Sequence, residues 1–265
     1  GYLRIRDILS NNDKMIVKNI TKKPLKTIFP DLDQEKAANI SMKYNMVNLP
    51  VIDQEQRLLG IINFDDIADI IYQEAEEDIS MIAGSGDLLI NEKSAIKISL
   101  TRIPWLLIAL FGEIISAIVI YQFSDDLKKA VVLSFFFPVI MAMGGNIGIQ
   151  ASSIIVRGLA TGDFLGLNIK KRLFKEIKAA LMNGFIICLI LFLIIFFWLK
   201  SIQLGLTVSI ALFTVVLNAA LVGTLVPFLL NKIKIDPAIS TGPFITTSND
   251  VFGLLIYLLI VTSFL

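Results

Sequence analysis

Histidine is absent from this sequence of 265 residues, and cysteine occurs once, at Cys188. Without histidine the commonest ligand sets of zinc and copper cannot be built, and a single cysteine makes no disulfide framework. Oxygen ligands remain, and these suit Mg²⁺ or Ca²⁺. The sequence also has no nucleophile motif and no Gly-rich phosphate loop, so we predict that the protein is not an enzyme.

Charged residues are scarce as well. They make up 18% of the chain, against about a quarter in soluble domains, and most lie in the first hundred positions. A net charge of +1 gives no basis for binding nucleic acid. With 55% hydrophobic residues and a mean hydropathy of +0.74, the chain is predicted to be a soluble piece joined to a membrane piece.

The start of the chain has neither an initiating Met nor a signal peptide. Gly1-Tyr2-Leu3 enters in the middle of a pattern, so we expect the chain to be a piece of a longer protein.

Long apolar runs fill the second part of the sequence. Five segments have about 20 or more residues with almost no charge, which is enough to cross a bilayer: 103–123, 130–156, 179–199, 202–230 and 242–265. The glycines and Pro138 of the second segment, and Pro227 of the fourth, predict helix breaks there. We therefore predict a mainly α membrane protein with five transmembrane helices.

Basic residues flank these spans unevenly. One side has Lys97, Arg102, Arg157, Lys170, Lys171, Arg172, Lys175, Lys178, Lys232 and Lys234, and the other has Lys128, Lys129 and Lys200. Because loops rich in Lys and Arg stay in the cytosol, the N-terminal part is predicted to be cytosolic. Five spans then place the C-terminus outside, in a multi-pass protein of the plasma membrane.

The polar part before the spans has an α/β pattern. A helix is predicted over 33–45, strands over 49–52 and 58–63, and a further helix capped by Asp65. This order resembles a CBS repeat, and residues 1–20 look like the tail of a preceding repeat. An incomplete module should leave apolar surface uncovered.

The second span is unusually polar for a membrane segment. Gly144, Gly145 and Gly148 allow another backbone to come close, and Asn146 and Gln150 share one helix face. Buried amides need partners in hydrocarbon. Helix packing with amide cross-links and a polar permeation path both fit these residues.

Two carboxyl groups fall inside the predicted spans, Glu113 and Asp250. A charge there is expensive and is by default a functional hypothesis. Asp250 follows a run of hydroxyls and an amide that includes Thr246, Thr247 and Asn249. Hydrogen bonds of the hydroxyls to their own backbone would explain the run but not Asp250. Glu113 is either a packed neutral acid, a polar contact to another span, or a coupling site for transport.

Acidic residues also gather in the helix before the spans. The candidates for a regulatory metal are Asp65, Asp66, Glu74, Glu76, Glu77 and Asp78. Residues three and four apart on a helix are neighbours, so like charges here repel unless a cation lies among them. A solvated acidic helix is the simpler interpretation.

Several of these motifs resemble those of MgtE-type magnesium transporters: Pro138, Gly144-Gly145-Asn146, Gln150, residues 157–162, Asp236-Pro237-Ala238 and the run ending in Asp250. The resemblance covers almost the whole chain in the order of the family. It implies a homodimer in which spans two and five line a magnesium path. It also implies that the aspartate of span five holds hydrated Mg²⁺, and that acids of the helix after the CBS part bind regulatory Mg²⁺.

The resulting prediction is a dimeric Mg²⁺ channel or transporter that imports the ion and is gated by cytosolic Mg²⁺. Its parts are a partial CBS module with the acidic helix (1–83), a linker (84–102) and a membrane domain (103–265). The alternatives are an ion-coupled efflux transporter of divalent cations with Glu113 as coupling site, a CBS-regulated permease or anion channel, and a membrane sensor. The sequence leaves nucleotide binding by the CBS part open.

Overall fold

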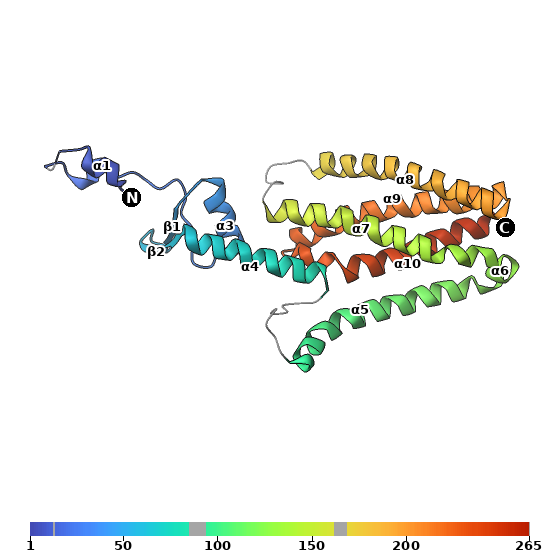
Figure 1. Cartoon of the computed structure of the whole chain (residues 1–265). Helices are drawn as coiled ribbons and strands as arrows, with labels where there is room; N and C mark the ends of the chain where they lie inside the picture. The colour runs from blue at the N-terminus through green and yellow to red at the C-terminus, as the bar shows by residue number, and fades with distance from the viewer. Residues whose placement is uncertain (13, 85–93, 162–168, 265) are drawn as a thin grey trace. The chain divides into compact units, whose positions relative to one another are not determined.

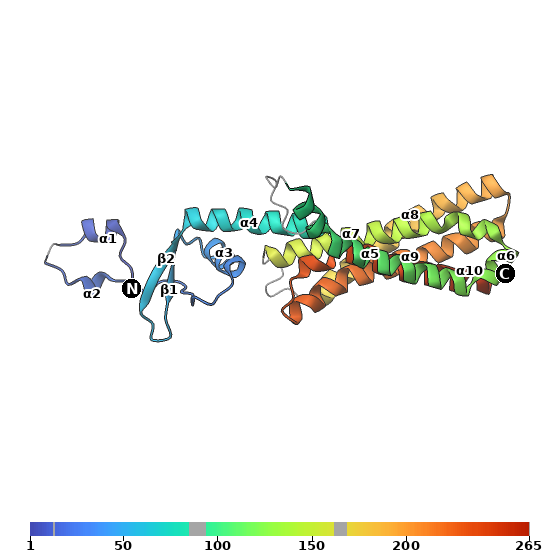
Figure 2. The ribbon, with the colours of Figure 1, turned by 90° about the horizontal axis from the view of Figure 1, so that it is seen from below.

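The computed structural model describes residues 1–12, 14–84, 94–161 and 169–264. The chain divides into two compact units, Gly1–Glu76 and Glu77–Leu265, which are described separately here. Figure 1 and Figure 2 show the ribbon from two directions.

The first unit contains the predicted α/β pattern. Helix α3 (Gln34–Lys43) begins after Asp33, whose carboxylate accepts hydrogen bonds from two backbone N–H groups of the first turn. Strands β1 (Asn48–Ile52) and β2 (Leu58–Asn63) form an antiparallel pair. Leu49 is fully buried with Ala37 and Ile28, so one side of β1 packs on α3. The predicted helix and both predicted strands are confirmed.

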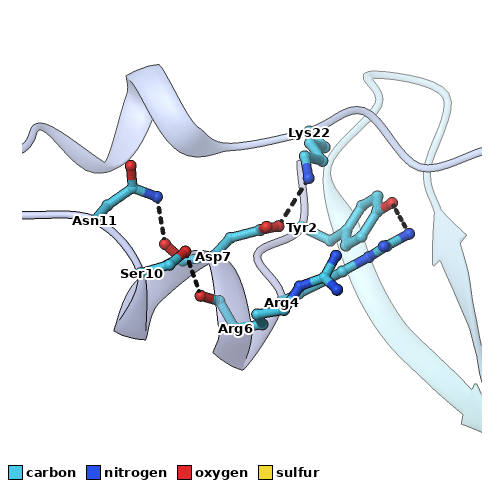
Figure 3. A network of polar contacts seen from close by, with 7 residues as sticks. All are labelled: Tyr2, Arg4, Arg6, Asp7, Ser10, Asn11 and Lys22. Carbon is cyan, nitrogen blue, oxygen red and sulfur yellow. Dashed lines mark hydrogen bonds and ion pairs between the residues drawn. The ribbon is translucent and has the colours of Figure 1, made fainter.

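A polar network ties the start of the chain together (Figure 3). Helices α1 (Ile5–Leu9) and α2 (Val17–Ile20) flank it. Lys22 Nζ lies 2.9 Å from Asp7 Oδ2, and this hydrogen-bonded ion pair lowers the pKa of the Asp7 carboxyl. Asn11 donates a hydrogen bond to the backbone carbonyl of Asp7. These contacts give the short segment local order without a core of its own.

Apolar side chains of the first unit remain uncovered, as predicted for an incomplete repeat. Leu9 is 80% exposed, Leu58 64% and Ile61 52%. Burial of these side chains by a partner surface would be favourable, because removing apolar surface from water contributes about 25 cal/mol for each Å².

Helix α4 (Phe64–Ile82) starts two residues earlier than predicted. Asp65 therefore lies inside the first turn and is not the cap. Instead, Asp66 Oδ2 accepts a hydrogen bond of 3.1 Å from the backbone N–H of Asn63. A side chain three residues into the helix that reaches back in this way forms one half of a capping box. The helix ends near Gly84, whose φ of +63° suits a residue without Cβ.

Five helical segments of the described residues are long and apolar enough to cross a membrane, as predicted. They are α5 (Ala95–Gln122), η1 with α7 (Val131–Phe136 and Phe137–Ala160), α8 (Ile169–Leu199), α9 (Ile202–Lys232), and η2 with α10 (Pro237–Ser240 and Pro243–Ser263). The short helix α6 (Ser124–Lys129) joins the first two.

The predicted helix breaks are only partly right. The second span is divided between η1 and α7, and Pro138 lies in the first turn of α7, where its missing N–H has no helical partner to lose. The glycines do not interrupt α7. Pro227 lies inside an unbroken α9, so the break predicted there is wrong. Pro227 is buried, and neighbouring spans hold the helix together.

The last part of the predicted linker is helical, because α5 begins at Ala95. The linker predicted over 84–102 includes residues 85–93, which lie outside the described residues. The predicted boundaries at 84 and 103 stay predictions.

Helix α9 is the centre of the second unit, where it packs against α7, α8 and α10 (Figure 1). Val208, Ala211 and Leu212 are completely buried in it. Helix α5, in contrast, packs mainly along α10, and most of its apolar side chains are exposed. These exposed faces suit contact with lipid or with another copy of the chain.

Candidate functional site

Helix α10 carries the carboxylate that the sequence singled out, Asp250. The helix starts after Gly242, which has a φ of +62°. A Cβ at Gly242 would lie 2.3 Å from the carbonyl oxygen of Ile82, so only glycine allows the end of α4 to come this close to the start of α10. Asp250 is half-buried, two turns into α10. The turn between η2 and α10 therefore sets where this acid lies.

Glu113 lies beside Asp250. The two helices that carry them, α5 and α10, touch closely at Gly112, where a Cβ would lie 1.6 Å from Thr247 Cγ2. Glu113 follows Gly112 directly and Asp250 comes three residues after Thr247, so this crossing brings the two acids near each other. The two acids that the sequence places in separate spans thus form a pair.

The predicted pore residues of α7 fall on two opposite faces. Gly144, Gly145 and Gly148 are buried, and their neighbours are residues of α9 and α10. Asn146 and Gln150 are exposed. The two glycines that we predicted to line a pore, Gly144 and Gly145, are buried in the packing of the chain, and their role in a pore stays a prediction. The amides remain available to a path or to a partner.

The packing at these glycines is tight. A Cβ at Gly148 would lie 1.9 Å from Asn249 Nδ2, and one at Gly223 of α9 would lie 2.4 Å from the carbonyl oxygen of Gly148. Helices α7, α9 and α10 therefore meet at Gly148. We did not predict Gly112 or Gly223 from the sequence. A small residue in a long apolar run is the signal that points to such contacts.

The polar run of α10 has three different environments. Thr246 donates hydrogen bonds to the carbonyl oxygens of Gly242 and Pro243, so its hydroxyl is used inside its own helix. Thr247 is half-buried against Gly112. Asn249 is 1% exposed, and among the described residues neither end of its amide has a hydrogen-bond partner. Asn249 was a predicted pore residue, but its burial places it against α7 rather than on an open face.

Three of the acidic candidates of α4, Glu74, Glu76 and Asp66, have hydrogen-bond partners within the protein. Glu74 Oε1 accepts a hydrogen bond of 2.6 Å from Gln34 Nε2 of α3. Glu76 accepts a hydrogen bond from Tyr72, and this bond, together with the negative charge of Glu76, raises the pKa of the Tyr72 hydroxyl. Asp66 is the capping residue described above. Of these contacts, the one between Gln34 and Glu74 joins α4 to α3 within the first unit.

Glu77 and Asp78 belong to the second unit, and each takes part in an interaction with another group. Within the described residues, three or more Asp, Glu, His or Cys side chains nowhere come together closely enough to hold a metal ion. The regulatory roles of Asp65, Asp66, Glu74, Glu76, Glu77 and Asp78 stay predictions.

Comparison with known proteins agrees with this architecture. Residues 137–260 match the family model "MgtE: Divalent cation transporter", and residues 17–73 match the CBS domain model. The chain is 33% identical over 265 residues to "Magnesium transporter MgtE" of Bacillus subtilis and 34% identical over 261 residues to that of Thermus thermophilus. The membrane part of the chain matches the MgtE family. The match spans 100% of this chain for the Bacillus protein and 97% for the Thermus protein.

The MgtE relatives are longer than this chain, which covers 59% of the Bacillus protein and 58% of the Thermus protein. A third relative, "Magnesium transporter MgtE" of Enterococcus faecalis, is 31% identical over 265 residues. The CBS match falls on the α/β part of the chain, and the transporter match falls on the membrane helices. Both resemblances drawn from the sequence are confirmed.

Proposed function

We propose that this chain forms the Mg²⁺ path of a transporter in the plasma membrane, and that Asp250 is the carboxylate facing the ion. The observation that carries the proposal is a half-buried acid in the middle of a membrane span, in a chain whose predicted spans contain no basic residue. Such an acid is costly unless a cation compensates it. Three relatives named as magnesium transporters support the choice of ion.

Two copies of the chain suit the chemistry of this ion. Mg²⁺ gives up its water reluctantly and is usually held by one or two carboxylates while it keeps several waters. One chain offers one strong candidate, so two Asp250 side chains about a two-fold axis supply a pair. The exposed amides of Asn146 and Gln150 are then available for the outer waters.

Exposure of these amides also supports a homodimer. Asn146 and Gln150 lie on the open face of α7, inside a predicted span. An unsatisfied polar group in hydrocarbon costs several kcal/mol. A second copy, or a water-filled path between two copies, removes this cost.

The pore acid is tested by substituting Asp250. In proteoliposomes, Asp250→Ala should abolish Mg²⁺ flux, and Asp250→Asn should be intermediate at best, because it keeps the shape but loses the charge. Asp125→Asn is the matched control, since Asp125 pairs with Lys128 outside the spans. Normal flux in Asp250→Ala at equal incorporation contradicts the proposal. Flux that requires a sodium or proton gradient would favour ion-coupled efflux.

We propose the orientation from the basic residues, with α4 in the cytosol and the C-terminus outside. Cysteines placed at Lys200 and Lys232, in a Cys188→Ala background, test it. Both lysines are exposed and lie at opposite ends of α9. A membrane-impermeant maleimide added to intact cells should label position 200 and spare position 232. The reverse pattern contradicts this orientation. It also contradicts the proposal that Mg²⁺ is imported toward the side of the membrane where α4 lies.

We further propose that cytosolic Mg²⁺ closes the path by binding to acids of α4. The close approach of Ile82 to Gly242 supports this, because a shift at the end of α4 acts directly on the start of α10. A ligand shifts such an equilibrium only by its difference in affinity for the two states. Neutralising Glu74, Glu77 and Asp78 together should therefore keep the path open at high cytosolic Mg²⁺. Equal inhibition of parent and variant in patch recordings would reject this mechanism.

A further inference from the structure

Helix α8 has two distinct faces. On its inner face, Cys188, Leu191 and Ile195 are buried in the core that α8 shares with α9, its main neighbour (Figure 1). A Cβ at Gly184 would lie 3.1 Å from Phe213 Cδ2 of α9, so the two helices pack closely. The opposite face of α8 points away from α9.

This outer face changes from cationic to apolar along the helix. Residues that follow one another at alternating intervals of four and three lie on one helix face. Such a series runs from the start of α8 to its middle, and all of its members are exposed. The lysine cluster consists of Lys171, Lys175 and Lys178. The apolar stripe consists of Met182, Phe185 and Leu189.

The positive charge of the lysine cluster is not compensated by the part of the chain that the structure describes. Arg172, on a different face of α8, pairs with Glu176. Among the described residues, no carboxylate forms an ion pair with a residue of the lysine cluster. The helix dipole gives no compensation either, because it disfavours cations near the start of a helix. The cluster therefore suits an anion from outside the chain.

The length of the series matches one leaflet of a bilayer. Lys178 and Leu189 are eleven residues apart, which corresponds to about 16 Å along a helix at 1.5 Å for each residue. Half of the hydrocarbon core is about 15 Å thick. A phospholipid has a phosphate above hydrocarbon of this depth, so it fits both parts of the face.

A second copy of this chain fits the face less well. An isologous contact brings the same patch of two subunits together. Here it would place one lysine cluster against another, and like charges that face each other cost energy. Charge thus favours a negative occupant over a second subunit.

We propose that the outer face of α8 binds an anionic phospholipid, with the lipid phosphate at the lysine cluster and an acyl chain along the apolar stripe. An anionic lipid is favoured over a zwitterionic one, because lysines near a membrane attract net negative charge. The proposed orientation, on which only the choice of leaflet rests, places the cluster at the negatively charged cytosolic leaflet. The role of Asp250 does not enter this inference.

Quenching at the apolar stripe tests the proposal with the full chain in detergent micelles. Leu189→Trp is made in a background in which the two native tryptophans, Trp105 and Trp198, are replaced by Phe. Phosphatidylglycerol with brominated acyl chains quenches a tryptophan that it contacts, and brominated phosphatidylcholine is the zwitterionic comparison. The measured quantity is the mole fraction of lipid that gives half of the maximal quenching.

Phosphatidylglycerol should quench at a lower mole fraction than phosphatidylcholine. Lys175→Gln with Lys178→Gln should raise the half-quenching mole fraction of phosphatidylglycerol by about tenfold or more, because two attractive charges are lost. Lys175→Arg with Lys178→Arg keeps the charge and should match the parent. Lys232→Gln with Lys234→Gln is the matched control, since both lysines are exposed near the end of α9, and it should also match the parent.

Three results overturn the proposal. Equal quenching by the two lipids, or an equal loss in the control at positions 232 and 234, shows that the lysine cluster forms no site. Displacement of the brominated lipid by inorganic phosphate at constant ionic strength shows that the cluster binds a phosphate ion rather than a lipid. A disulfide-linked dimer of Met182→Cys, in a Cys188→Ala background oxidised in membranes, shows that a second copy covers this face. None of these results depends on the flux of Asp250→Ala, so the proposed function stands or fails separately.

Discussion

Asn249 shows how much a single residue of α10 depends on its surroundings. It is next to Asp250 in the sequence, yet its side chain is buried against Gly148, and no group in the described part of the chain forms a hydrogen bond with it. A buried amide that loses its contacts with water and gains none is a net cost to folding. Ser240, also fully buried, is the opposite case, because its hydroxyl donates to the carbonyl of Pro237 at 2.6 Å.

We predict that Asn249→Leu, which has nearly the same shape, leaves the free energy of unfolding unchanged or raises it by about 1 kcal/mol. Ser240→Ala is the control and should lower thermal stability, because it removes a satisfied hydrogen bond. Thermal unfolding of both variants in detergent checks this. A marked loss of stability in Asn249→Leu would mean that the amide has a partner, such as a bound water.

The closeness of the two acids within the spans also depends on a single residue. The sequence places Glu113 and Asp250 more than a hundred positions apart, and the structure makes them one pair. Their closeness depends on Gly112, which has no chemistry of its own but lets α5 approach Thr247.

At the scale of helices, the glycines of α7 act as packing positions. A Cβ at Gly148 would lie 1.9 Å from Asn249 Nδ2 and 2.9 Å from Ile245 Cγ2. A Cβ at Gly145 would lie 3.5 Å from Thr246 Cγ2, which is an ordinary contact distance. Two glycines of one helix therefore tolerate substitution very differently.

We predict that Gly148→Ala lowers thermal stability and Mg²⁺ flux, since α7 must move away from α10, whereas Gly145→Ala remains close to the parent. The expected loss for Gly148→Ala is about 1–3 kcal/mol, typical of overpacking. Both variants are compared by thermal unfolding and by flux at equal incorporation. Equal behaviour of the two alanines would show that the contact at Gly148 relaxes freely.

Tyr257 joins α10 to the irregular start of the second span. Its hydroxyl donates a hydrogen bond of 2.8 Å to the carbonyl of Leu133 in η1, and its ring meets Phe137 edge to face. The 3-10 geometry of η1 leaves carbonyls without helical partners, and one of these is satisfied from another span.

Tyr257→Phe should lower the free energy of unfolding by about 1–3 kcal/mol, because it keeps the ring and leaves a buried carbonyl unpaired. Tyr121→Phe is the control, since Tyr121 is 75% exposed. Unfolding of the two variants in detergent should show a clear loss for position 257 alone. An unchanged value at position 257 would mean that water replaces the hydroxyl.

At the scale of the whole molecule, the feature that matters is the amide face of α7, the helix face that carries Asn146 and Gln150. Asn146 and Gln150 are exposed there, on the side of the helix opposite its buried glycines. A two-fold axis beside this face would bring the same residue of two copies together.

We predict that Asn146→Cys, in a Cys188→Ala background, forms a disulfide-linked dimer upon oxidation in membranes. Disulfides need Cα atoms within about 7 Å, so the result reports directly on the axis. Ile186→Cys is the control, because Ile186 is 55% exposed on α8, away from α7. Cross-linking at 186 but not at 146 would place the interface elsewhere.

The sequence by itself determined the number of spans, the helix and strands of the CBS part, and the two acids within the membrane. Hydropathy, turn residues and charge act over a few neighbouring positions, so a local pattern is enough to predict these features. The resemblance to the MgtE family followed from motifs that are equally local.

Only the tertiary structure decided which face of α7 is buried, that α9 runs unbroken through Pro227, and that Glu113 meets Asp250. Each of these depends on the fit between spans far apart in the chain. Gly148 lies against Asn249 and Gly223 because three helices pack together, and a glycine looks the same in sequence whether it lines a path or receives a neighbour. Packing of this kind is a property of pairs of surfaces, and no single segment encodes it.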